Sequence, residues 1–199
     1  MILLRTCLTF DFIGSNSEDT ADDAGSVQAP STWRSIIEDR STMQLFFDCY
    51  HAFQSTTLTR EVLECLVQLA SIRRSLLGDL ERPQYLGNLL RGSKLILTSG
   101  KGLEHVENYH ELCRFIARVK STYQLGELVA VDIYPEWIDL IAQLTVRSFR
   151  NLQWSPNSLQ YLLNFWAKMI SSSTYMLKTS AARPHRLEVY LPQVHLSPV

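Results

Sequence analysis

The segment YHELCRFIA at residues 109–117 shows most clearly how this chain folds. Apolar residues recur in it at intervals of three and four, namely Tyr109, Leu112, Cys113, Ile116 and Ala117. Because an α-helix has about 3.6 residues per turn, that spacing places them all on one helix face. The segment therefore predicts an amphipathic helix that packs on one side.

The same period continues on both sides of this segment. Comparable apolar stripes predict five further helices, in residues 42–53, 57–77, 82–99, 135–149 and 155–170. The inward faces of the last two are expected to include Phe149, Leu163 and Ile170, and serines from Ser171 onward are expected to end the last helix. Alternating apolar residues are scarce, so the sequence predicts an all-α chain without a β-sheet.

The spacing of these helices is that of a repeat. They form three antiparallel pairs that open near Thr42, Arg82 and Pro135. Each pair with its connection occupies roughly 40 to 50 residues, the period of HEAT and armadillo repeats. The apolar stripes are wide enough for each pair to pack on both neighbours. We therefore predict an α-α superhelix, a solenoid of HEAT or armadillo type with about three helix pairs.

The composition divides the chain into four expected parts. They are the end of a preceding helix at residues 1–13, an acidic flexible loop at 14–32, HEAT-like helical repeats at 33–175 and a truncated irregular tail at 176–199. The loop carries four carboxylates between Glu18 and Asp23 and no aromatic residue before Ser31, a composition that cannot bury enough surface to order itself. Neither end has the polar face of a capping repeat, so we expect a piece of something longer.

Composition and charge exclude several classes of protein. The 199 residues are 46% hydrophobic and 20% charged, as in a folded chain with a core. Nineteen basic residues against twenty acidic ones give a net charge of −1, so no direct binding of nucleic acid is expected. No apolar run reaches the roughly 18 to 20 residues of a membrane span, so no membrane insertion is expected. The four cysteines are widely spaced and form no CxxC pair, which predicts reduced thiols in a cytosolic or nuclear protein.

A search for catalytic residues finds few candidates. Glu107, His110 and Cys113 are helical neighbours, and a metal site or a Cys–His nucleophile is conceivable there. However, Arg114 stands where an HExxH motif would need its second histidine, and no second group of ligands follows. The segment SGKG at residues 99–102 lacks the spacing of a phosphate-binding loop and fits a helix-ending turn. We therefore predict no catalytic, cofactor-binding or metal-binding residue, no cofactor and no enzyme.

The other charged groups fit a solvated surface. The carboxylate pairs Glu61 with Glu64 and Glu104 with Glu107 have helical spacing and are expected on exposed faces. Arg73 and Arg74 are expected near a helix C-terminus, where they would oppose the helix dipole.

The four tryptophans are the remaining candidates for contact with a partner. Trp137 and Trp166 lie within apolar stripes and are expected in the core. Trp33 and Trp154 lie near helix boundaries, and their role stays open.

Short strings along the chain resemble the exportin-7 and Ran-binding protein 17 family of nuclear transport receptors, within the importin-β superfamily. The resemblance covers about residues 7–194 and is carried by FDFIG at 10–14, WRS at 33–35, QLFFD at 44–48, YH at 50–51, CLVQ at 65–68, RRSL at 73–76, NYHE at 108–111, YQLGELV at 123–129, YPE at 134–136, PNS at 156–158, YLL at 161–163 and PH at 184–185.

This resemblance implies a fragment of an export receptor that binds the GTPase Ran in its GTP form together with a protein cargo. It also implies contacts with nuclear pore components and shuttling between nucleus and cytoplasm. Family members are several times longer and hold Ran largely through their first repeats. No individual Ran-contacting or cargo-contacting residue is therefore transferred to this chain.

Three alternatives remain open at this point. The chain could be a HEAT-type scaffold or regulatory subunit unrelated to transport, which would share the helical period but not the strings. It could be a non-functional truncated isoform. It could also be a small helical enzyme that uses Cys113 and His110, and such an enzyme would lose its activity on Cys113→Ala.

Overall fold

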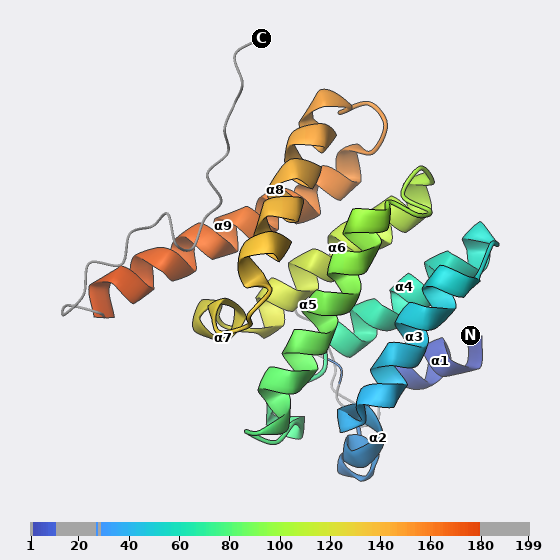
Figure 1. Ribbon diagram of the computed structural model, residues 1–199, viewed down its shortest axis with the longest axis vertical. Coiled ribbons are helices and arrows are strands. Elements are labelled where there is room, and N and C mark those ends of the chain that lie inside the picture. The colour runs from blue at the N-terminus through green and yellow to red at the C-terminus, as the bar shows by residue number, and fades with distance from the viewer. Residues whose placement is uncertain (1, 11–26, 28, 180–199) are drawn as a thin grey trace.

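A computed structural model describes residues 2–10, 27 and 29–179 of the chain, and all its regular structure is helical (Figure 1). The α-helices of the described residues are α1 (Ile2–Thr9), α2 (Arg34–Glu38), α3 (Arg40–Ala52), α4 (Thr56–Ala70), α5 (Glu81–Ser99), α6 (Val106–Thr122), α7 (Leu125–Val129), α8 (Tyr134–Arg150) and α9 (Pro156–Thr179). Two 3-10 turns, Ser31–Trp33 and Arg74–Leu76, accompany them. The predicted all-α class is confirmed.

The long helices form three pairs that stand side by side, α3 with α4, α5 with α6, and α8 with α9 (Figure 1). The second helix of each pair contacts the second helix of the next, so that α4, α6 and α9 make one layer and α3, α5 and α8 the other. This is the expected superhelix of HEAT or armadillo type. In the described part of the chain, no helix combines the length and apolarity needed to cross a bilayer.

The two layers are not packed equally closely. Contacts within the layer of α4, α6 and α9 are more extensive than those between α3, α5 and α8. The layer of α4, α6 and α9 is therefore the more closely packed side of the stack.

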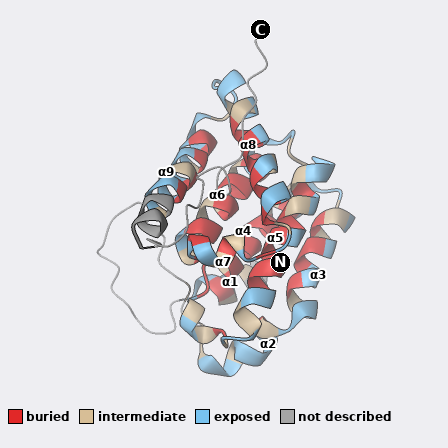
Figure 2. Cartoon of the chain, turned by 60° about the vertical axis from the view of Figure 1, so that its left-hand side comes forward, coloured by how far each residue is buried: buried red, intermediate tan, exposed pale blue. Residues whose placement is uncertain are grey.

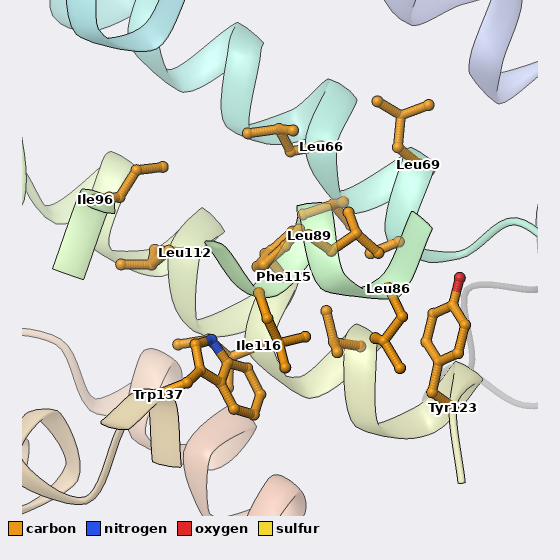
Figure 3. Close-up of a cluster of buried hydrophobic side chains, with 14 of the residues drawn as sticks. Leu66, Leu69, Leu86, Leu89, Ile96, Leu112, Phe115, Ile116, Tyr123 and Trp137 are labelled. Carbon is orange, nitrogen blue, oxygen red and sulfur yellow. The ribbon is translucent and has the colours of Figure 1, made fainter. Parts of the chain in front are cut away.

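The core lies between the layers and is continuous from pair to pair (Figure 2). Leu66 of α4, Leu89 of α5, Ile116 of α6 and Trp137 of α8 gather in one cluster (Figure 3). Each of these side chains is 1% exposed or less. Burial of such side chains, rather than local helix preference, therefore holds the pairs together.

Buried polar groups join elements that are distant in sequence. The Tyr85 hydroxyl donates a hydrogen bond to the Leu69 carbonyl over 3.0 Å and so joins α5 to the end of α4. The Asn108 amide donates to the Thr59 hydroxyl over 2.9 Å and joins α6 to α4. Because unpaired buried polar groups are costly, these bonds favour one alignment of the pairs.

The second predicted helix is shorter than expected, because α4 ends at Ala70 and not at Leu77. The Val27 amide donates to the Ser71 carbonyl over 2.9 Å, and the Arg73 amide donates to the Val27 carbonyl over 3.4 Å. These bonds form an isolated β-bridge between Val27 and Ile72, so the backbone after Ala70 is satisfied without a further helical turn. Periodicity within one segment does not reveal a partner so distant in sequence.

The last helix is longer than expected, because α9 continues through Ser171 to Thr179. The Ser171 hydroxyl donates to the Ala167 carbonyl over 2.9 Å, and the Ser172 hydroxyl donates to the Lys168 carbonyl over 2.7 Å. Serines bonded back to the preceding turn are compatible with a continuing helix. The expected stop at Ser171 is therefore wrong.

Three residues that were expected to face inward are exposed. Phe149 is 49% exposed, Leu163 40% and Ile170 54%. Helix α9 instead packs through a stripe that includes Leu162 and Phe165, both completely buried. The apolar stripe of α9 is wider than the face that it buries in the described part of the chain.

The expected boundaries of the four parts remain predictions. Most of the expected acidic loop, residues 11–26 and 28, and the tail from residue 180 onward lie outside the described residues.

Candidate functional site

Glu107, His110 and Cys113, the group in which a catalytic or metal site was conceivable, do not form one site. Cys113 is completely buried, and this burial raises the pKa of its thiol to about 12. His110 lies toward α9, with its Nδ1 3.2 Å from the Ser158 hydroxyl and its ring edge-on to Tyr161. Glu107 is exposed. A nucleophile must be a thiolate at neutral pH, so the Cys–His mechanism does not fit this geometry.

We predict that cysteine modification will separate the four thiols of the folded chain. Burial raises the pKa of Cys65 to about 11 and that of Cys113 to about 12, whereas Cys7 and Cys49 are only partly buried. Each unit of increase in pKa lowers the thiolate fraction about tenfold. At pH 8, iodoacetamide should therefore modify Cys7 and Cys49 first, as read by mass spectrometry.

Chain unfolded in urea is the control for that experiment, and all four cysteines should react there. Modification of Cys113 in the folded chain at the rate of Cys49 would contradict the described burial.

The SGKG segment is a structural turn, as expected. Gly100 ends α5 in the left-handed conformation with φ 65°, where glycine has no steric penalty. The Lys101 ammonium donates to the His51 carbonyl, and the Tyr50 hydroxyl donates to the Lys101 carbonyl over 2.6 Å. Lys101 is thus engaged within the protein. No group of three or more potential metal ligands occurs among the residues that the structure describes.

One of the two carboxylate pairs differs from expectation. Glu104 and Glu107 are exposed, as expected, but Glu61 is only 9% exposed. Glu64 forms ion pairs with Arg5 of α1 and with Arg60, the latter over 3.4 Å. The sequence could not show this arrangement, because it arises from the packing of α1 against α4.

The two neighbouring arginines also differ from expectation. Since α4 ends at Ala70, neither Arg73 nor Arg74 lies in its last turn. The Arg74 guanidinium instead donates to a carboxylate oxygen of Glu127 in α7 over 2.9 Å. The Glu127 carboxylate in turn accepts a hydrogen bond from the backbone N–H of Gln124 over 2.8 Å and caps α7. This pair therefore joins the segment after α4 to α7.

The tryptophans agree with the expected distribution only in part, because Trp137 lies in the core and Trp166 at its edge. Trp137 is completely buried and donates to the Ser93 hydroxyl over 2.9 Å. Trp166 is half-buried and donates to the Thr145 hydroxyl over 3.0 Å. Trp33 packs partly buried against the core. Trp154 is 42% exposed, so among the four it is the one that a partner could reach most directly.

The closely packed layer of α4, α6 and α9, called here the α4–α6–α9 face, carries a polar cleft of about 390 Å³. Its lining includes Arg60 and Glu64 of α4, His110 and Glu111 of α6, and Asn157 at the start of α9. Burial raises the pKa of Glu111, although Arg114 lies 3.2 Å from its carboxylate. The sequence did not predict this cleft, because α9 reaches it only through the stacking of the third pair.

The α4–α6–α9 face offers charges of both signs and hydrogen-bonding groups over three helices. Except for Glu111, which is only 8% exposed, these groups lie on exposed or partly exposed positions, and their geometry suits contact with another protein. A reaction centre requires a nucleophile, a base and hydrogen-bond donors that stabilise the charge developing in the transition state. The described residues do not bring such groups together.

Comparisons with known proteins find close relatives in sequence. The chain is 48% identical to human Ran-binding protein 17 and to Exportin-7-B of Xenopus laevis, in each case over 192 residues. It is 37% identical over 191 residues to Exportin-7 of Dictyostelium discoideum. Each alignment covers 96% of this chain but only 17% to 18% of the relative's length. No protein-family model matches the chain, and no solved structure matches it.

Proposed function

We propose that this chain serves as part of a nuclear transport receptor. The premise is that the chain is homologous, over 96% of its length, to part of the exportin-7 and Ran-binding protein 17 family. The observation on which this proposal rests is the 48% sequence identity to human Ran-binding protein 17. The stack of helix pairs supports it, because such a stack offers an extended surface for other proteins.

The proposed activity is binding and not catalysis. In this proposal the receptor binds Ran in its GTP form together with a protein cargo, contacts nuclear pore components and shuttles between nucleus and cytoplasm. The α4–α6–α9 face supports a role in protein contact, since its cleft carries exposed or partly exposed polar groups such as Arg60 and Asn157.

We expect the native protein to associate with Ran in a nucleotide-dependent way. Cell extract would be supplied with Ran carrying either GDP or a non-hydrolysable GTP analogue and separated by gel filtration. Fractions would be blotted under denaturing conditions with an antibody against residues 57–77. The recognised protein should elute together with Ran when Ran carries the GTP analogue, and apart from it when Ran carries GDP.

The same blot measures the size of the native protein. Because the chain spans 17% of the length of the relatives that it matches, we expect a band several times heavier than 22.8 kDa. Elution that is independent of the nucleotide would contradict the transport proposal and favour a HEAT-type scaffold with another purpose. The isolated 199-residue chain serves as a comparison, and we expect it to bind Ran weakly or not at all.

A further inference from the structure

A second cavity, of about 280 Å³, lies on the edge of the stack where the α5–α6 and α8–α9 connections of the second and third helix pairs meet. We call it the loop-end pocket. Its apolar and aromatic lining comes from α5, the α5–α6 connection, α6, α8 and the α8–α9 connection, and consists of Leu97, Leu103, Tyr109, Leu140, Leu144 and Trp154. A cavity of this size with a mainly apolar and aromatic lining can take one bulky apolar side chain of a partner.

Trp154 forms a wall of the loop-end pocket that a partner can reach. Its ring packs edge-on to Tyr109 with centroids 5.0 Å apart, while 42% of the residue is exposed. The Tyr109 hydroxyl is hydrogen-bonded to the Ser148 hydroxyl, which fixes the ring against which Trp154 packs. Such a half-exposed aromatic on a rigid support is typical of an anchor for a protein partner.

Arg147 is the charged side chain in this lining. It is exposed, and within the described part of the chain its guanidinium forms neither an ion pair nor a hydrogen bond. An unpaired guanidinium next to an apolar pocket complements a carboxylate next to an apolar side chain, because the guanidinium fork binds carboxylates through two hydrogen bonds.

The geometry points to the loop-end pocket as a docking site for a peptide segment of a partner protein that carries one bulky apolar side chain flanked by carboxylates. The apolar side chain enters between Trp154 and the leucines, and a flanking carboxylate pairs with Arg147. This inference goes beyond the proposed function, because it names a segment-binding site that does not depend on Ran or on its nucleotide.

The test uses the full 199-residue chain and a fluorescein-labelled peptide of sequence GSDDFDDSG, with binding read by fluorescence anisotropy. We expect saturable binding that is lost when alanine replaces the phenylalanine of the peptide. Replacement of its four aspartates by lysine should weaken binding at least about tenfold.

Two pairs of matched variants test the binding site, and the Arg147 pair separates the loop-end pocket from the polar cleft, because Trp154 lines both. Arg147→Glu should weaken binding at least about fivefold, whereas Arg150→Glu, one turn further along α8 and outside the lining, should change it less than about twofold. Trp154→Ala should weaken binding at least about tenfold, whereas Leu152→Ala, which is 51% exposed in the same connection, should change it less than about twofold.

Three results would overturn the inference. The first is the absence of saturable binding, and the second is an equal loss for Arg147→Glu and Arg150→Glu, which would indicate unspecific attraction. The third is that Arg147→Glu and Trp154→Ala change the oligomeric state, measured by sedimentation, but not the binding of the peptide. That result would make the pocket a contact between copies of this chain. Each of these results leaves the nucleotide-dependent association with Ran unaffected, so the two proposals fail separately.

Discussion

Trp137→Ala is expected to lower the free energy of unfolding by about 3 to 5 kcal/mol, because it removes a large aromatic side chain from a fully packed site. Trp137 is completely buried where α5, α8 and α9 meet, and it packs edge-on against Phe165 of α9 with centroids 6.0 Å apart. Its indole also donates to the Ser93 hydroxyl of α5 over 2.9 Å. The substitution therefore weakens the contact between the second and third helix pairs as well as the core.

Urea denaturation followed by far-ultraviolet circular dichroism measures this loss. Trp154→Ala is the matched control, because Trp154 is 42% exposed, and its removal should cost only about 1 kcal/mol or less. Trp137→Phe should lie between the two, since it keeps most of the packing but not the hydrogen bond to Ser93. An equal loss in Trp137→Ala and Trp154→Ala would contradict the core position of Trp137.

The sequence predicted those features of the fold that repeat along the chain. The stripe that contains Leu112 and Ile116 predicted α6, and both residues are completely buried. The spacing of the helices predicted the three pairs, because a stack of pairs needs the same pattern in each unit. The core position of Trp137 followed from the same periodicity.

Features that depend on contacts between distant segments could not be predicted in this way. The end of α4 depends on Val27, which bonds to the backbone around Ile72 from far along the chain. The ion pair of Glu64 with Arg5 depends on where α1 packs.

The candidate surfaces show the same limit. The polar cleft and the loop-end pocket each need α9 or its connection beside an earlier helix pair. The sequence identifies Trp154 as an aromatic residue at a helix boundary, but it does not reveal the neighbours of Trp154 in space.

A second large effect concerns the contact between α3 and α5. Gly92→Ala is expected to destabilise the chain by about 1 to 3 kcal/mol, the usual cost of overpacking a core. A Cβ atom at Gly92 would lie 2.2 Å from the Phe47 ring, well inside van der Waals contact. Phe47 is only 2% exposed, so its ring cannot move aside into solvent. The clash outweighs the gain of up to about 1 kcal/mol that alanine brings to a helix interior.

Gly87→Ala in the same helix is the matched control, and it should have the opposite sign. A Cβ atom there would meet the end of the Arg91 side chain at 3.0 Å, and this flexible side chain is 49% exposed and can move away. The variant should therefore gain up to about 1 kcal/mol from helix propensity. Thermal unfolding of both variants and of the unchanged chain measures the two effects. If Gly92→Ala melts at as high a temperature as Gly87→Ala, Phe47 does not close the contact between α3 and α5. Phe47→Leu combined with Gly92→Ala should recover part of the loss, since the smaller side chain leaves room for the added methyl group.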